Sequence, residues 1–296
     1  PIVSAAGCDT PAGTYRFYGY VHYLDGTLLG KRPGDQPQFD PGVLTEGETT
    51  WLYTGFCRKN DPSRIGSMVC ALEPDMVTVK EGPDFLIPDA FHSQGTGFEG
   101  HEFFEASSIR KRNGLYYLIY SSILGHELCY AVSRFPNRDF TYGGVIVSNN
   151  DSYISTYKPA ERPMYYGGNN HGSIVEIQGQ WYVFYHRHTN GTNFSRQGCI
   201  EPQAEMTSCG PNQGPLPGNG TYPAYIACNL YCRDESAFTA LPGDWMDCRF
   251  PKITQDGCGG SEAQGYIANL RDGAAAGFKY FSCDAVKQIS VTTRGM

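Results

Sequence analysis

The sequence predicts an all-β protein, and three observations carry this prediction. The chain of 296 residues contains 21 Tyr and 16 Phe, and aromatic residues favour strands. It also contains 36 Gly and 19 Pro, which are typical of tight turns. No long window shows the apolar period of about 3.6 residues that marks an amphipathic helix. Short strands joined by turns therefore account for the whole pattern.

Three segments of the chain share one design. Each opens with an ionisable residue and a small one, runs into an apolar strand, makes a Gly-containing polar turn and returns through an aromatic strand. The segments are DPGVLTEGETTWLYTGF from Asp40, EASSIRKRNGLYYLIYSS from Glu105 and HGSIVEIQGQWYVFYHR from His171. The turns Asn113-Gly114 and Gln178-Gly179 have the chemistry of short hairpin connections.

The spacing of these openings predicts a β-propeller. They are separated by 65 residues (40 to 105) and 66 residues (105 to 171), and hairpins at a fixed period of this size indicate propeller blades. The runs HELCYAVS and GGVIVS supply further strands, which gives about four strands per blade. The alternative is a β-sandwich in which similar hairpins recur by coincidence.

Three blades cannot close a ring, because propellers have about four to eight. Residues 1–39 can supply only the end of an earlier blade, so we expect one or two blades to be missing upstream. The composition changes after residue 207, where GPNQGPLPGNGTYPAY is typical of a loop. We therefore predict a partial propeller over 1–207, a linker packed on it over 208–260, and the start of an accessory β module over 261–296.

Charge and hydropathy exclude two classes of partner. The net charge is −7, and the longest basic cluster is Arg110-Lys111-Arg112. Nucleic acids and anionic membranes require a larger basic face, so neither is expected as a partner. No apolar run approaches the roughly 18 residues of a membrane-spanning helix.

The eleven cysteines are odd in number and irregular in spacing, and they form no CxxC pair. Several lie in strand-like runs, where a free thiol acts as a small buried hydrophobe. This pattern favours a reducing compartment, and so the cytoplasm over secretion. The N-terminal residues lack a signal-peptide pattern, which carries no weight if upstream residues are missing.

The three openings predict a site. The innermost strand of each blade lines the central channel of a propeller, so Asp40, Glu105 and His171 should converge on one mouth. Glycosidic hydrolysis needs an acid to protonate the leaving oxygen and a base to activate water, and two carboxylates suit it. Phe103 and Phe104 precede Glu105, and an apolar setting would raise its pKa as a general acid requires.

Each of these interpretations has a structural alternative. Glu99 and Glu102 have no counterparts in the repeat register and are expected to be loop residues. Asp40 could simply begin a turn, His171 could be a satisfied structural residue, and Arg196 could bridge strands. The aromatic residues Phe39, Phe56 and Tyr120 could stack on sugar rings or belong to the core, and His101, His186 and His188 could line the mouth.

Four motifs resemble glycoside hydrolase family 43. They are FDPGVLTEGETTWLYTGF, FFEASSIRKRNGLYYLIYSS, NNHGSIVEIQGQWYVFYHR and FSRQGCIEP, in order over residues 1–207. This resemblance implies an inverting enzyme with a five-bladed β-propeller, chiefly a β-xylosidase or an α-L-arabinofuranosidase. The segment YIANLRDGAAAGFKYF resembles the start of the accessory β-sandwich of some members.

The resemblance also implies roles for individual residues. Glu105 falls on the general acid, and Asp40 falls on the aspartate that orients this acid and tunes its pKa. Arg196 falls on an arginine that reaches the sugar. His171 falls on a histidine close to the channel, near or on a calcium ion in many members, which makes it a candidate metal ligand. Phe39 and Phe56 are candidate sugar-binding residues beside them.

Two features depart from the family pattern. No motif matches the family's aspartate base, and Asp9, Asp25 and Asp35 lie in turn-like settings, so the base is expected upstream. Glu201 passes almost directly to the next strand, where members have a longer hairpin. The predicted function is release of arabinose or xylose from arabinoxylan, arabinan or xylo-oligosaccharides of plant cell walls. The alternative is a carbohydrate-binding propeller, or a fragment that is inactive without the base.

Overall fold

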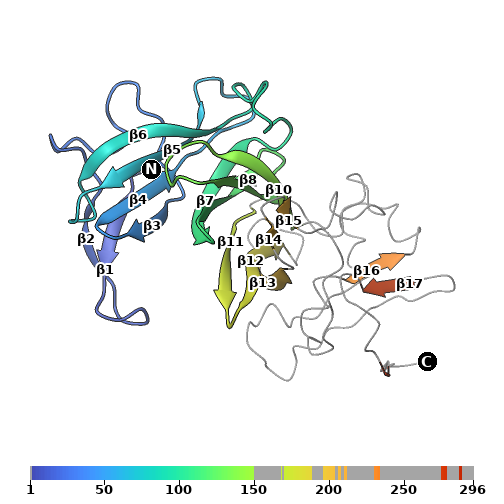
Figure 1. The fold of residues 1–296 in the computed structure, drawn as a ribbon. Coiled ribbons are helices and arrows are strands. Elements are labelled where there is room, and N and C mark those ends of the chain that lie inside the picture. The colour runs from blue at the N-terminus through green and yellow to red at the C-terminus, as the bar shows by residue number, and fades with distance from the viewer. Residues whose placement is uncertain are drawn as a thin grey trace.

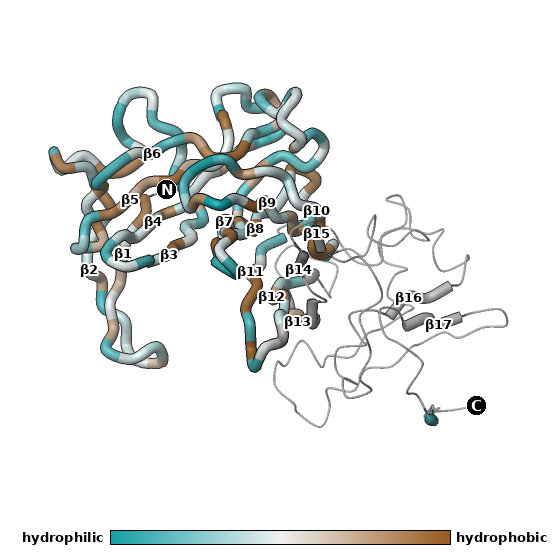
Figure 2. Tube along the Cα trace, viewed as in Figure 1, coloured by the Kyte–Doolittle hydropathy of each residue, from teal (hydrophilic) through white to brown (hydrophobic). Residues whose placement is uncertain are grey.

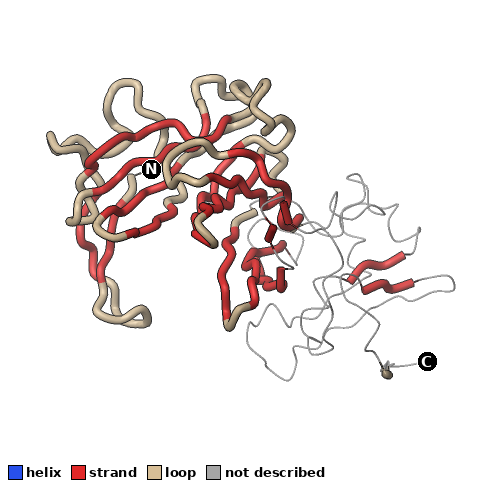
Figure 3. Tube along the Cα trace, viewed as in Figure 1, coloured by secondary structure: helices blue, strands red, loops and turns tan. Residues whose placement is uncertain are grey.

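The structure is a computed structural model that describes residues 2–149, 168, 170–188, 196–203, 206–207, 210–211, 230–233, 275–278 and 287–288. These residues form strands, turns and loops, and no helix occurs among them (Figure 3). The prediction of an all-β protein is therefore confirmed. Within the same ranges there is no helix long and apolar enough to cross a membrane.

The predicted repeats form successive antiparallel sheets (Figure 1). The first contains, in order, β3 (Gly42–Glu46), β4 (Thr49–Thr54), β5 (Gly66–Leu72) and β6 (Val79–Pro88). The second contains β7 (Phe103–Arg112), β8 (Leu115–Ser122), β9 (Glu127–Ser133) and β10 (Thr141–Ser148). The third contains β11 (Gly172–Ile177), β12 (Gln180–His188) and β13 (Arg196–Gln203). Each sheet begins with one of the three sequence repeats, as predicted.

Three two-stranded sheets complete the described strands. They pair β1 (Ser4–Gly7) with β2 (Arg16–Tyr20), β14 (Met206–Thr207) with β15 (Gly210–Pro211), and β16 (Leu230–Arg233) with β17 (Ala275–Phe278). Most of the predicted linker over 208–260 and of the accessory module over 261–296 lies outside the described residues, so that division stays a prediction.

Two of the hairpins close through left-handed turns of two residues. Asn113 and Gly114 have φ of 49° and 76°, and Gln178 and Gly179 have φ of 53° and 83°. Positive φ at both central positions gives a turn whose twist matches that of the flanking strands. This geometry fixes the register of each hairpin, so that the first residues of β7 and β11 take defined positions.

The sheets pack face to face, with apolar cores on both sides of the central one. On β8, Tyr116, Leu118 and Tyr120 join a core shared with the first sheet. The alternate residues Tyr117 and Ile119 join a second core shared with the third sheet. Side chains alternate between the two faces of a strand, so one strand serves both cores. The hydrophobic stretches in Figure 2 fall mainly on such central strands.

The innermost strands of the three sheets lie next to one another, with β7 in contact with both β3 and β11. The hydroxyls of Ser108 and Ser173 lie 2.9 Å apart across the β7–β11 boundary. Between β3 and β7 the backbones approach so closely that a Cβ on Gly42 would lie 2.4 Å from the carbonyl oxygen of Ser107. This packing brings together the residues that open each strand.

Candidate active site

The backbone at the start of β7 is irregular. The register of β7 on β8 shifts between Phe103 and Ser108, and Ala106 within this bulge has a φ of 70°. Asp40, just ahead of β3, has a φ of 46°. A non-glycine residue in this region costs about 1–3 kcal/mol, and such strain is typical of functional sites. The bulge aims the Ala106 N–H at the carboxylate of Asp40, which accepts its hydrogen bond.

Asp40 also faces two basic side chains, those of His171 and Arg196. Its Oδ2 lies 3.8 Å from Nδ1 of His171, whose side chain is half exposed. Burial raises the pKa of Asp40, while the charges of His171 and Arg196 and the Ala106 N–H act in the opposite direction. The residue that precedes β3 is thus linked to the starts of β7, β11 and β13.

The pKa of Glu105 is raised from its usual range to about 7. Burial is the largest cause, the negative charge of Asp40 raises it further, and Arg196 lowers it. A carboxyl group with this pKa is protonated in about half of the molecules at neutral pH. Glu105 can therefore donate a proton under conditions in which an ordinary glutamate cannot.

Three aromatic rings form a cluster that includes the residues just before Asp40 and Glu105 in the chain. Phe39 and Phe104 immediately precede Asp40 and Glu105, and both contact Phe56, with centroids 5.2 Å and 5.5 Å from its ring. The segment that carries Phe56 is held by backbone bonds, from Gly55 N to Phe39 O at 3.1 Å and from Cys57 N to Phe104 O at 2.8 Å. All three rings are partly exposed, so they form an apolar wall that a sugar ring could contact.

The other glutamates near this strand have different surroundings. Glu99 is exposed and accepts the backbone N–H of Gly95. Glu102 is buried and accepts bonds of 3.0 Å from the Ser93 hydroxyl and from the Gly100 N–H. Both therefore shape the loop before β7, as the repeat register predicted.

The aspartates in the N-terminal part also hold turns, as expected. Asp25 accepts the Thr27 N–H and pairs with Arg32 at 2.8 Å, and Asp35 accepts the Tyr23 hydroxyl. Asp9 is exposed. Within the described part of the chain, the hydrogen bonds and ion pairs of Asp25 and Asp35 involve neither Asp40 nor Glu105.

The described residues around His171 offer few ligands for a metal ion. Calcium takes about six to eight oxygen ligands, whereas here one imidazole faces one carboxylate, that of Asp40. In the described part of the chain, the group of three or more metal-ligating side chains lies elsewhere, at His101, Glu127 and Cys129. Among the described residues, His171 and Asp40 would supply only part of a calcium coordination shell, and water would complete it.

The structure changes the expected surroundings of the site at several residues. Phe103 is fully buried in the core, so Phe104 alone of the two joins the aromatic wall. Arg58 is exposed and stacks on Phe56, with its guanidinium carbon 5.3 Å from the ring centroid. His101 does not face Asp40 but pairs with Glu127. The side chain of His188 lies outside the described residues.

The sequence model of glycosyl hydrolases family 43 matches residues 3–205, which is more than half of the chain. The chain belongs to this family. A xylosidase/arabinosidase of Thermoclostridium stercorarium is 64% identical over 305 residues, covering 100% of this chain and 64% of the relative. A xylosidase/arabinosidase of Bacteroides ovatus is 34% identical over 176 residues, covering 59% of this chain and 45% of that protein. The chain thus spans less than two thirds of the length of either relative.

Solved family-43 structures share the fold of this chain. A β-xylosidase/α-arabinofuranosidase from a compost microbial metagenome, solved calcium-free with xylotriose, has a TM-score of 0.51 at 23% identity. The matched region covers 69% of this chain and 62% of the solved enzyme. A GH43_1 enzyme from Xanthomonas citri has a TM-score of 0.52 at 24% identity, with coverages of 71% and 63%. The antiparallel sheets of this chain therefore share the fold of solved family-43 enzymes.

Proposed function

We propose that this protein is an inverting glycosidase that releases arabinose or xylose from plant cell-wall polysaccharides or oligosaccharides. One observation carries the proposal: in a family-43 chain, three successive blades bring Asp40, Glu105 and His171 together, and Glu105 has a pKa of about 7. The relatives named xylosidase/arabinosidase support a pentose as the sugar released.

In the proposed mechanism, Glu105 is the general acid. Its protonated carboxyl donates a proton to the glycosidic oxygen as the bond to the leaving group breaks. A carboxylate base on the opposite face of the sugar activates the attacking water, which inverts the anomeric centre. That base would lie roughly 6.5–9.5 Å from Glu105, because water must fit between the two groups.

Asp40 has a positioning role in this scheme. Its negative charge disfavours ionisation of Glu105 and so keeps the acid protonated near neutral pH. The Ala106 N–H bonds to Asp40, and His171 and Arg196 surround it, which holds the carboxylate in place beside the acid.

The remaining residues are proposed to bind the sugar. Arg196 is a cation facing both carboxylates, and its guanidinium can donate two parallel hydrogen bonds to sugar hydroxyls. Phe39 and Phe56 offer an apolar face for the ring, and the half-exposed His171 can donate to or accept from a hydroxyl.

The proposal extends to the architecture. We infer a five-bladed propeller, which residues 1–207 form in part, a linker over 208–260 and an accessory β module over 261–296. Three consecutive blades and membership of the family support the propeller. Calcium at His171 is the proposed cofactor, with water supplying most of its oxygen ligands, because the described residues around His171 offer few. Arabinoxylan, arabinan and xylo-oligosaccharides are the proposed partners, and the proposed location is the cytoplasm.

The test is a screen of the full-length protein on aryl α-L-arabinofuranoside and aryl β-xyloside, followed by NMR of the first product formed. We expect turnover of at least one substrate, with the released sugar in the inverted anomeric form. Retention of configuration would contradict the mechanism. Glycan binding without release of reducing sugar would instead indicate a binding module.

A further inference from the structure

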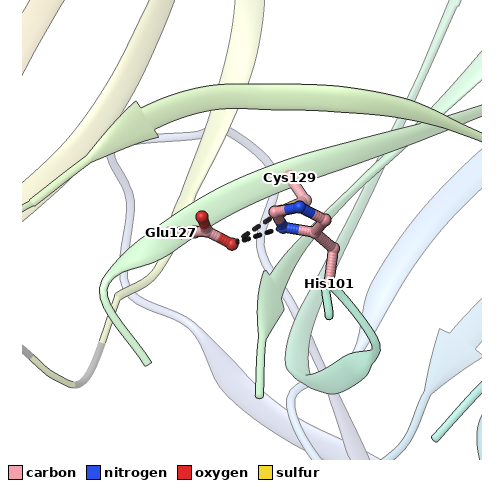
Figure 4. Close-up of side chains that lie close together, drawn as sticks. All are labelled: His101, Glu127 and Cys129. Atoms are coloured by element: carbon pink, nitrogen blue, oxygen red, sulfur yellow. Dashed lines mark hydrogen bonds and ion pairs between the residues drawn. The ribbon is translucent and has the colours of Figure 1, made fainter. Parts of the chain in front are cut away.

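A second group of reactive side chains lies in the same blade as Glu105. His101 precedes β7, while Glu127 and Cys129 lie two residues apart on β9 and share one face of that strand. Figure 4 shows the three side chains converging. The His101 Nδ1 lies 2.8 Å from Glu127 Oε2, the Cys129 Sγ lies 3.7 Å from the same oxygen, and all three ligand atoms lie within 4.8 Å of one another.

Surrounding contacts hold this group in place. The Ser122 hydroxyl donates to Glu127 at 2.9 Å, and the Tyr120 hydroxyl donates to the His101 carbonyl at 2.7 Å. The ring of Tyr142 stacks on the His101 imidazole, with centroids 4.9 Å apart. Supporting hydrogen bonds of this kind orient the ligands in metal sites.

Burial leaves the group open on one side. The side chain of Glu127 is 2% exposed and Cys129 is fully buried, whereas the His101 side chain is 31% exposed. An ion would therefore reach the group from the side of the imidazole, and water would supply the remaining ligand.

The donor set suits zinc. Zinc is commonly bound by histidine nitrogen, cysteine sulfur and carboxylate oxygen in a tetrahedron, with bonds of about 2.0–2.3 Å. Two ligand atoms of such a tetrahedron lie about 3.3–3.8 Å apart, by geometry from those bond lengths. The Sγ–Oε2 distance of 3.7 Å falls in this range, and the Nδ1–Oε2 distance of 2.8 Å would need to open by a few tenths of an ångström.

The charges also balance. The hydrogen bond to Glu127 raises the pKa of His101, which favours the protonated imidazole beside this carboxylate. Burial raises the pKa of the Cys129 thiol, which is therefore neutral. A divalent ion would displace one proton from His101 and one from Cys129. The two charges of the ion would then replace the two charges of these protons. The net charge of the group would not change, and Glu127 would remain neutralised.

We propose that His101, Glu127 and Cys129 bind one zinc ion, with water as the fourth ligand. The alternative is a hydrogen-bonded ion pair that takes no metal. In that alternative Cys129 remains a buried thiol that donates to Glu127, whereas the zinc site requires its deprotonation. Bound zinc would tie the loop that ends at His101 to β9, and so would stabilise the loop before the Glu105 strand.

Equilibrium dialysis of the full-length protein against Zn²⁺, with metal quantified by atomic absorption, tests this proposal. We expect the wild-type protein to bind one Zn²⁺ ion more than either His101→Gln or Cys129→Ala. Each substitution should raise the dissociation constant of this site at least tenfold. Cys70→Ala is the matched control, because Cys70 is a buried thiol on β5 outside the group. Circular dichroism establishes whether each variant is folded. If Cys129→Ala does not fold, His101→Gln still tests the proposal, because it changes a partly exposed residue.

Cobalt gives an independent readout. Co²⁺ bound by the wild-type protein should show a thiolate-to-cobalt charge-transfer band in the near ultraviolet, which Cys129→Ala should abolish and Cys70→Ala should keep. Zinc binding should release close to two protons per ion in weakly buffered solution below the pKa of His101. No stoichiometric binding, or binding that both His101→Gln and Cys129→Ala leave unchanged, would overturn the proposal.

Discussion

Asp40 Oδ2 lies 3.8 Å from Nδ1 of His171, although the two residues open the inner strands of different blades, on either side of the strand that starts near Glu105. The Ala106 N–H binds the same aspartate. Asp40 therefore links three sheets at one point, and its charge adds to the effect of burial in raising the pKa of Glu105.

Glu105→Gln should lower kcat on natural glycosides by about 10²–10⁴-fold, the usual contribution of a general acid. An aryl glycoside with a good leaving group needs little protonation, so its turnover should fall much less. Steady-state kinetics on both substrates in the full-length protein measure this difference. Glu99→Gln is the matched control, because Glu99 is an exposed loop residue, and it should change neither rate. An equal loss on both substrates would remove Glu105 from the acid role.

The pH profile should depend on Asp40. With a pKa of about 7, Glu105 loses its proton as the pH rises above neutrality, so kcat/KM should fall on the basic side. Asp40→Asn removes the negative charge that raises this pKa, so the basic limb should move to lower pH. The kcat/KM–pH profiles of wild type and variant provide the measurement. A limb that stays in place would show that Asp40 does not tune the acid.

Arg196→Met should shift the same limb in the opposite direction. The guanidinium lowers the pKa of Glu105, so its removal should extend activity to higher pH. If Arg196 also holds the sugar, KM should rise together with this shift. A pH profile that moves like that of Asp40→Asn would contradict the electrostatic assignment.

Much of this arrangement could be predicted from local sequence. A two-residue turn such as Asn113-Gly114 fixes a hairpin from its own chemistry, and the period from Asp40 to Glu105 to His171 places the strand openings together. The repeat also distinguishes Glu105 from Glu102. The buried carboxylate of Glu102 accepts hydrogen bonds from its own loop.

Other features depend on contacts that local sequence does not encode. The left-handed backbone of Ala106 arises where β7 bulges against β8, and alanine has no local preference for it. His101 meets Glu127 and Cys129 only because β9 folds back beside the start of β7. Phe103 and Phe104 look alike in sequence, and only the packing of the sheets assigns one to the core and the other to the site.

Glu105 should make the protein less stable at high pH. In the unfolded chain its pKa returns to an ordinary value, below the folded value of about 7, so the folded state binds more protons between them. This contribution to stability is therefore lost as the pH rises through that window. Glu105→Gln should raise the free energy of unfolding by about 1–2 kcal/mol at pH 8, after allowance for its partial exposure, and by little at pH 4. Urea unfolding at both pH values measures the difference, and an equal effect at both would contradict it.

Gly42→Ala should perturb both the stability and the site. The added Cβ would lie 2.4 Å from the Ser107 carbonyl oxygen, so the inner strands β3 and β7 would have to separate. Such overpacking costs about 1–3 kcal/mol. Gly42 lies two residues after Asp40, and Ser107 two after Glu105, so the separation should also weaken their coupling and reduce kcat. Gly7→Ala is the matched control, because a Cβ on Gly7 meets nothing within 4 Å. Thermal unfolding and steady-state kinetics should show lower stability and lower kcat for Gly42→Ala than for Gly7→Ala. Equal stability and activity of the two variants would show that the close approach of β3 and β7 does not matter.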